Sequence, residues 1–148
     1  MEQIIYALQF KGQAAPVEGA SGVMKAATSA PGCAITTEVG PNGVRGDLRP
    51  AGGGTAEFES EVTLTGDTSF LESGMITFGQ GNRLRFSTVG QGYLGPSADP
   101  RLSTGAVIWR IDSGEGQFAG ATGLITSNFS VSDTGEVTDN HFGVIFLG

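Results

Sequence analysis

The chain has 148 residues and a formal net charge of −7 at pH 7, with 15 acidic and 8 basic side chains. That length fits one domain, residues 1–148, with one sizeable core. Eight basic residues scattered along the chain do not make a track for phosphates, so we expect no nucleic-acid partner.

From the N-terminus, short β-prone runs alternate with turn signals. Residues Met1–Lys11 predict a strand, and the small residues of Gly12–Gly22 predict a loop or an edge. Residues Ala34–Val39 and Val44–Arg49 flank Gly40-Pro41-Asn42-Gly43, whose Asn-Gly step predicts a hairpin. Two strands joined by a tight turn are therefore expected here.

The next segment is a Gly-rich loop over Pro50–Gly54, followed by an alternating strand over Glu57–Thr65. The alternation puts apolar and acidic side chains on opposite faces: Phe58, Val62 and Leu64 on one, and Glu57, Glu59 and Glu61 on the other. Residues Gly74–Phe78 and Arg83–Val89 flank Gly79–Asn82 and predict a second hairpin.

The last third reads as a long loop over Gly90–Thr104 and three more strands: Gly105–Asp112, Ala121–Ser132 and Glu136–Leu147. Asp133-Thr134-Gly135 joins the final two as a pair, and no run with helical period is present. Eight to ten antiparallel strands in one all-β domain predict a sandwich or a closed barrel. The 25 glycines favour the barrel, because strong curvature needs glycine or bulges.

Cellular context is predicted from absences in the sequence. Cys33 is the single cysteine, so no intramolecular disulfide forms, which favours a reducing compartment. The N-terminal residues lack the basic region of a signal peptide, and no apolar stretch has the length of a membrane span. We therefore expect a cytoplasmic protein that does not associate with membranes.

The stretch Gly114–Ile125, GEGQFAGATGLI, resembles the G-x-G-x-[FY]-x-G-x-x-G signature of allene oxide cyclases. Dirigent proteins and bacterial spirotetronate-forming cyclases carry similar hairpins. The resemblance implies an eight-stranded, calycin-like barrel with an aromatic in its floor, an apolar cavity, frequent oligomers and no cofactor. The functional Glu and Asn of the family's first strand match Ala7 and Gln9 here, which implies a different reaction.

Other cofactor sites are not expected. Gly114–Ala119 also fits a loose dinucleotide fingerprint, but that motif needs a following helix, and a strand is predicted there. With one histidine and one cysteine far apart in sequence, a His/Cys metal site is not expected.

Three residues are candidates for catalysis. His141 is the only histidine, and it becomes an acid or base if the face it shares with Ile145 lines a cavity; a position on the rim or surface is the alternative. Glu59 and Arg85 either belong to a solvated face or point into the barrel. Inside, burial would raise the Glu59 pKa for proton transfer, and Arg85 would hold an anionic oxygen.

Four residues are candidates for substrate binding. Tyr6, Trp109 and Phe142 are aromatic residues on predicted strands, where they either pack the core or line a cavity. Asn128 lies among apolar neighbours and would orient a ligand if it points inward.

These features favour a cofactor-independent isomerase, cyclase or lyase that acts on a small, mostly apolar molecule inside the barrel. A non-enzymatic carrier of a small hydrophobic ligand, in the manner of lipocalins, is the alternative, and a structural role in an assembly is the third. Residues Gly143–Leu147 are apolar on both faces of the strand, which predicts a homo-oligomer, either a dimer or a trimer.

Overall fold

The computed structural model describes all residues 1–148 and shows an all-β protein with a single antiparallel sheet of nine strands. The elements are β1 (Glu2–Pro16), β2 (Val23–Gly40), β3 (Gly43–Leu64), β4 (Ser69–Phe78), β5 (Arg83–Thr88), β6 (Gly92–Pro96), β7 (Leu102–Glu115), the 3-10 turn η1 (Gly116–Phe118), β8 (Thr122–Ser132) and β9 (Glu136–Leu147). None of its helical segments has the length and apolar character that crossing a membrane requires.

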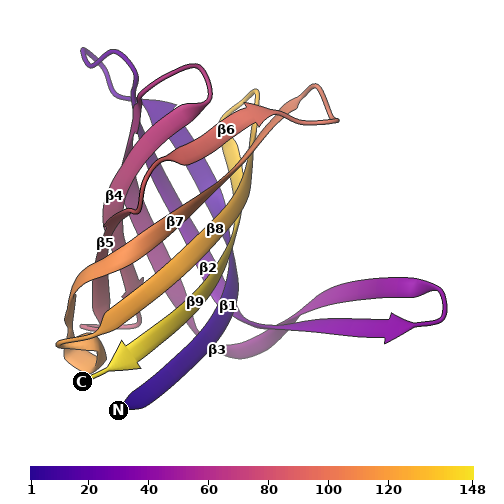
Figure 1. Cartoon of the computed structure of the whole chain (residues 1–148), viewed down its shortest axis with the longest axis vertical. Helices are drawn as coiled ribbons and strands as arrows, with labels where there is room; N and C mark the ends of the chain where they lie inside the picture. The colour runs from indigo at the N-terminus through magenta and orange to yellow at the C-terminus, as the bar shows by residue number, and fades with distance from the viewer.

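Eight of the strands close into a ring, in the order β1, β2, β3, β4, β5, β7, β8, β9. The first and last strands of this series complete it, since β1 pairs with β9 from Glu2–Leu147 to Gln13–Glu136. The short strand β6 pairs with β4 and β7 at the end of the ring that lies away from both chain termini (Figure 1). The all-β, antiparallel prediction is confirmed, and the sheet closes on itself.

The predicted hairpins are confirmed, whereas two segments predicted as loops contain strands. The turns at Gly40–Gly43, Gly79–Asn82 and 133–135 each join paired strands. Residues Pro50–Gly54, however, belong to β3, and the segment Gly90–Thr104 contains β6 and the start of β7.

Strand β1 extends to Pro16, so the segment Gly12–Gly22, predicted as a loop or an edge, is strand up to Pro16 and lies outside the strands over residues 17–22. Gly12 is needed here for a close approach of strands, because an added Cβ would contact the Ala27 carbonyl and lie 2.7 Å from Thr28 Cα. Composition alone does not separate a glycine required by strand packing from one required by a turn.

The middle of the ring is filled by aromatic side chains that point inward from four strands, β1, β3, β5 and β7. Phe58 stacks on Phe86 and on Trp109, with ring centroids 5.4 Å apart in each pair, and Phe10 lies 6.0 Å from Phe58. All four are buried. This cluster makes the centre of the ring a packed core rather than an open channel.

One end of the ring is closed by Phe118. The turn η1 brings this side chain into the core, where its ring lies 5.2 Å from that of Phe78. Gly114 and Gly116 allow the tight path, because an added Cβ at either would contact backbone atoms, and Gly116 has a φ of 66°. The Gly-rich stretch thus places an aromatic at the end of the ring nearest the termini.

The ends of β2 and β3 leave the ring together as a projecting two-stranded ribbon (Figure 1). We refer to residues Ala34–Arg49 as the arm. It begins at a β-bulge between Pro31 and Cys33, and its residues are exposed. The arm contributes nothing to the packed core.

Candidate active site

Two carboxylates are buried inside the ring, each held by a serine on the neighbouring strand. The Ser60 hydroxyl on β3 donates to Glu72 Oε2 on β4 at 2.6 Å. The Ser127 hydroxyl on β8 donates to Asp139 Oδ1 on β9 at the same distance of 2.6 Å. Buried acidic groups are costly unless hydrogen-bonded, and these short bonds meet part of that need.

Local sequence explains the inward position of Glu72. Strand alternation carries it on the same face as Phe70 and Ile76, both of which are buried in the core. The hydroxyl of Thr88 fixes the backbone, accepting from the Glu72 N–H at 2.7 Å and donating to the Glu72 carbonyl at 2.8 Å. The carboxyl is thus presented from a rigid strand.

His141 holds the second carboxylate in place. Its Nε2 lies 2.9 Å from Asp139 Oδ2, and its ring stacks on Phe10 with centroids 4.2 Å apart. Ser127 and His141 bind different oxygens of the same Asp139, so the histidine does not contact the serine hydroxyl. A nucleophile triad needs histidine between serine and acid, and this arrangement therefore excludes one at these residues.

The environment of Glu72 raises its pKa to about 7. Burial is the main cause, and the negative charge of Asp139 adds to it. The hydrogen bond from Ser60 opposes the shift, as does the nearby indole N–H of Trp109, which does not reach hydrogen-bonding geometry. A carboxyl with this pKa is present in both protonation states near neutral pH.

Glu72 and Asp139 both line a cavity of about 60 Å³, to which Leu94 of β6 also contributes. The other lining residues are mostly apolar: Ala14, Met24, Ala26, Thr28, Phe58, Val62, Phe70, Leu94, Phe129, Val131 and Val137. Met24, Leu94 and Val131 are partly exposed, so the outer wall reaches the surface. Small-molecule pockets commonly occupy about 300–1,000 Å³, and this cavity accepts only a small group.

The hydroxyl of Thr28 is the remaining polar group on the cavity wall. It is buried and has no hydrogen-bond partner within the protein. An unpartnered buried hydroxyl is unfavourable, and each such group needs an explanation. On this wall it is free to bind a polar atom of a molecule in the cavity.

Three of the residues selected from the sequence point into the ring. His141 and Trp109 are fully buried, with ring centroids 5.0 Å apart, but neither lines the cavity. The alternative of a rim or surface position for His141 is wrong. Tyr6 packs edge-on against Phe78 at 5.3 Å, its hydroxyl has no partner, and burial followed by the Asp139 charge raises its pKa.

Glu59 and Arg85 do not meet inside the ring, which corrects the expectation that placed them there. Both are exposed on the outer face, on either side of Met75, along a shallow groove. Strand alternation is the reason, because their neighbours Phe58 and Phe86 take the inward positions. Glu59 and Arg85 therefore belong to a solvated face, which was the alternative that the sequence left open.

Asn128 and Phe142 also lie on the outer face. Asn128 is exposed, and its carbonyl accepts a hydrogen bond from Asn140 at 3.3 Å. Phe142 is 51% exposed and alternates with the inward-pointing His141. Neither side chain lines the interior cavity, so the prediction that they contact a ligand there is wrong.

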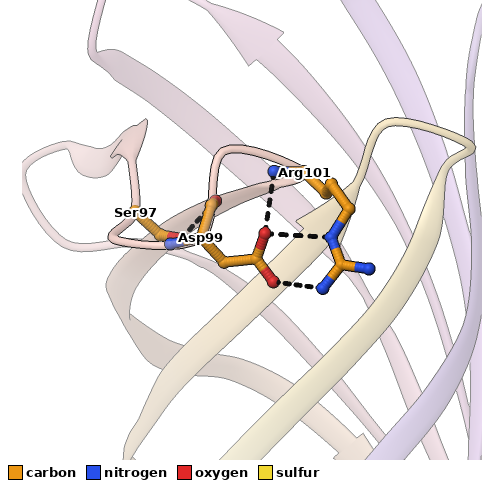
Figure 2. Close-up of polar contacts among 3 residues, drawn as sticks. All are labelled: Ser97, Asp99 and Arg101. Carbon is orange, nitrogen blue, oxygen red and sulfur yellow. Dashed lines mark hydrogen bonds and ion pairs between the residues drawn. The ribbon is translucent and has the colours of Figure 1, made fainter.

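A charged turn follows β6, the strand that contributes Leu94 to the cavity wall. Figure 2 shows the Asp99 carboxylate accepting from Arg101 Nε at 3.1 Å and from a terminal guanidinium nitrogen at 2.8 Å. The guanidinium holds the pKa of Asp99 below its usual range. Ser97 joins the same turn through its hydroxyl, which donates to the Asp99 carbonyl at 2.8 Å. These contacts shape the connection from β6 to β7.

Sequence reasoning missed the two buried carboxylates, although a signal for each was present. The series Phe70, Glu72, Gly74 and Ile76 alternates, with an acid on an otherwise apolar face. Extending the His141–Ile145 face backward by two residues reaches Asp139. An acid on the apolar face of a strand would have identified both residues.

No group of three or more His, Cys, Asp and Glu side chains is arranged to hold a metal ion. No family model matches the chain, and neither a curated protein nor a solved structure matches it. The functional interpretation rests on the geometry of the two carboxylates and the cavity.

Proposed function

We propose that the protein binds a small, mostly apolar molecule at the cavity end of the ring and acts on it by acid–base catalysis. The observation that carries this proposal is Glu72, a buried carboxyl on the wall of an otherwise apolar cavity. Glu72 is the group that gives or takes the proton, and its pKa of about 7 suits both directions. The reaction class is isomerisation, cyclisation or elimination without a cofactor.

Each neighbouring group has a role in this proposal. The Thr28 hydroxyl donates to an oxygen of the bound molecule, which orients it toward Glu72. Asp139, fixed by Ser127 and His141, supplies the negative charge that helps keep Glu72 protonated. His141 is a positioning residue here, because it does not line the cavity.

The size of the cavity defines the kind of substrate. A volume of about 60 Å³ accepts a small reacting group, while the remainder of the molecule lies among partly exposed apolar side chains such as Met24 and Leu94. Apolar lactones, epoxides and enones combine one polar end with an apolar body and fit this description, and polyenes offer the apolar body without the polar end.

We further propose that the ring is an eight-stranded barrel of the allene oxide cyclase kind in a cytoplasmic protein. The Gly-rich stretch Gly114–Ile125 supports the barrel type, together with the burial of Phe118 at the end of the ring. The unpaired thiol of Cys33 supports a reducing compartment.

The test begins with a thermal-shift screen of those four compound classes at several pH values. Binding stabilises the folded protein, so a ligand is recognised by a concentration-dependent rise in Tm. Each ligand is then incubated with the protein and its consumption is measured. We expect consumption by the wild type and by Glu59→Gln, which neutralises an exposed acid, and at least about a 100-fold loss for Glu72→Gln.

The outcomes separate two functions. A ligand that binds but persists unchanged would contradict the enzyme and leave a carrier, which the mostly apolar wall of the cavity also favours. Equal turnover by Glu72→Gln and the wild type would exclude Glu72 as the proton-transferring group. Near-ultraviolet circular dichroism from the buried Trp109 monitors the fold of each variant.

A further inference from the structure

The arm has one apolar face and one polar face. Strand pairing places Ile35 opposite Leu48 and Val39 opposite Val44, and these four aliphatic side chains share one face. Their exposed fractions are 47% for Ile35, 84% for Val39, 73% for Val44 and 40% for Leu48. The other face carries two ion pairs, Glu38–Arg45 at 2.8 Å and Asp47–Arg49 at 2.7 Å.

Nothing within one chain covers the apolar face. An isolated two-stranded ribbon is marginally stable in water, and an aliphatic row exposed along it adds the hazard of uncontrolled strand pairing. Exposed apolar rows of this kind mark interaction surfaces. The arm therefore has the form of an element that packs against another surface.

A strand edge on the ring also lacks a partner. Strand β1 pairs with β9 from Glu2 to Gln13, but with β2 only from Lys11 to Pro16, because β2 departs as the arm. The N–H of the even-numbered Ala14 donates to the Gly135 carbonyl, directly before β9. Because backbone groups alternate along a strand, the odd-numbered residues of β1 direct their N–H groups to the vacant side. On this side of β1 the Cys33 thiol donates a hydrogen bond to the Ala7 carbonyl at 3.7 Å.

An apolar groove of about 500 Å³ lies beside this open edge. Ten of its twelve lining residues are hydrophobic, and they include the partly buried, inward-facing side chains of Ile4, Tyr6, Leu8 and Phe78. A strand paired with the open edge of β1 would direct alternate side chains into this groove. The groove and the apolar face of the arm are thus complementary in chemistry.

We propose that the arm of one chain docks on the open edge of β1 in a second copy, with its apolar face in the groove, and that the second copy does the same in return. The arm then extends the sheet by strand addition and fills the gap in the ring. Each chain offers one arm and one groove, so a reciprocal, two-fold exchange satisfies both.

The length and the charge of the arm favour the arm of a second copy as the occupant of the open β1 edge. At roughly 3.3 Å per residue, the open edge Glu2–Phe10 spans about 30 Å and the arm strand Gly43–Arg49 about 23 Å, so the arm fits along the edge. The arm carries two arginines and two acids and is neutral, whereas the whole chain has a net charge of −7. A neutral contact element limits the repulsion between two acidic copies.

The path of the chain directs the arm away from its own groove. The bulge between Pro31 and Cys33 shifts the register at the base of the arm, and Pro31 has no N–H to offer β1. Gly52 and Gly53 have positive φ values of 74° and 85° on the returning strand. Folding back onto its own ring would require the arm to change this geometry.

Measurements of the oligomeric state and of amide hydrogen exchange together test the reciprocal docking of the arms. Light scattering after size exclusion should give the wild type twice the chain mass of 15.1 kDa. Ile35→Lys, on the apolar face, should raise the dimer dissociation constant by at least about 30-fold. Thr36→Lys, the adjacent residue on the polar face, should leave it unchanged. Leu48→Lys repeats the first test from the facing strand.

The exchange rates of β1 amides locate the contact. Amides of Gln3, Ile5, Ala7 and Gln9 should be protected in the wild-type and Thr36→Lys dimers and exposed in Ile35→Lys. A monomeric wild type would overturn the proposal, as would a dimer that survives both Ile35→Lys and Leu48→Lys. Equal dissociation by Thr36→Lys, or unprotected β1 amides in a dimer, would also overturn it. Near-ultraviolet circular dichroism from Trp109 verifies that each ring is folded.

Discussion

The residue with the largest expected effect on pH behaviour is Glu72. Its pKa rises from an ordinary 4.5 in the unfolded chain to about 7 in the folded protein, so the folded state binds more protons between these values. The stabilising effect of the protonated form is complete below about pH 4.5 and is lost as pH rises through 7. The free energy of unfolding of the wild type should therefore fall between pH 4.5 and 7, by on the order of 3 kcal/mol.

Urea denaturation across pH 4–8 measures this contribution as a difference between variants. Glu72→Gln keeps an acceptor for Ser60 and cannot ionise, so we expect the fall to disappear. Glu59→Gln, on the exposed face of the neighbouring strand, should retain it. If the Glu72→Gln and wild-type profiles are parallel, Glu72 does not have a raised pKa.

Substitution of Thr28 should have opposite effects on the stability of the protein and on ligand binding. Its buried hydroxyl has no partner, so Thr28→Val removes an unsatisfied group at nearly constant volume and should raise the free energy of unfolding by about 1 kcal/mol. The same change should weaken binding of any ligand found by the screen about fivefold, since a hydrogen bond is lost. Urea denaturation and ligand titration check the two effects. A variant that is less stable, or that binds equally well, would show that the hydroxyl does not serve the cavity.

Among the individual residues of the site, some positions could be predicted from the sequence and others could not. Core packing was expected for Trp109, and the structure shows it buried. For His141 the sequence left an inward and a surface position open, and the structure places it inside the ring. Glu59 and Arg85 could not be placed, because period two defines two faces without stating which is the inner one. Glu72 was missed because its strand was predicted to begin only at Gly74.

Among the strands, the paired neighbours β3 and β4 approach each other closely enough that a glycine is required. An added Cβ at Gly74 would contact the Glu59 carbonyl and lie 2.8 Å from Ser60 Cα and 2.9 Å from Phe86 Cζ. Gly74→Ala should therefore cost about 1–3 kcal/mol of stability, because two of these atoms belong to the backbone and cannot move aside. Gly54→Ala is the control, since nothing lies within 4 Å of its added Cβ.

Gly54→Ala should change the free energy of unfolding by less than about 1 kcal/mol in either direction. Chemical denaturation of both variants gives the comparison. An equal loss in the two would show that backbone entropy, rather than the close approach of β3 and β4, determines the need for glycine at position 74.

The elements with strong local signals were predicted well. The paired strands β8 and β9 and the three hairpin turns combine alternation with turn residues at the correct spacing. The strand β6 and the middle of β3 were read as loops, because glycine and proline dominate both. Their strand structure comes from pairing with neighbours, which local composition does not encode.

The closure of the ring depends on the two ends of the chain. Twelve residues of β1 pair with β9, so the first and last strands must meet before the interior is enclosed. The all-β, antiparallel class was predictable from the number of strands, and the glycine content favoured a closed arrangement. The projecting arm was not predictable in the same way, because its hairpin signal does not state whether the paired strands remain in the ring.

Two deletions of similar length should therefore have opposite consequences for the ring. Replacing Ala34–Arg49 with two glycines removes the arm, which lies outside the packed core, and should change the Tm of dilute protein by less than about 4 °C. Truncation after Gly135 removes β9 with Asp139 and His141, opens β1 and β8, and should abolish the cooperative transition.

Near-ultraviolet circular dichroism from Trp109 reports the packed interior in both deletion variants. The variant without the arm should keep this signal and should also keep the fall in stability that Glu72 causes between pH 4.5 and 7, since Glu72, Ser60 and Asp139 all remain. Loss of the signal in the variant without the arm would show that the ring does not fold independently of it. Retention of a cooperative transition without β9 would show that the β1–β9 pairing does not hold the interior together.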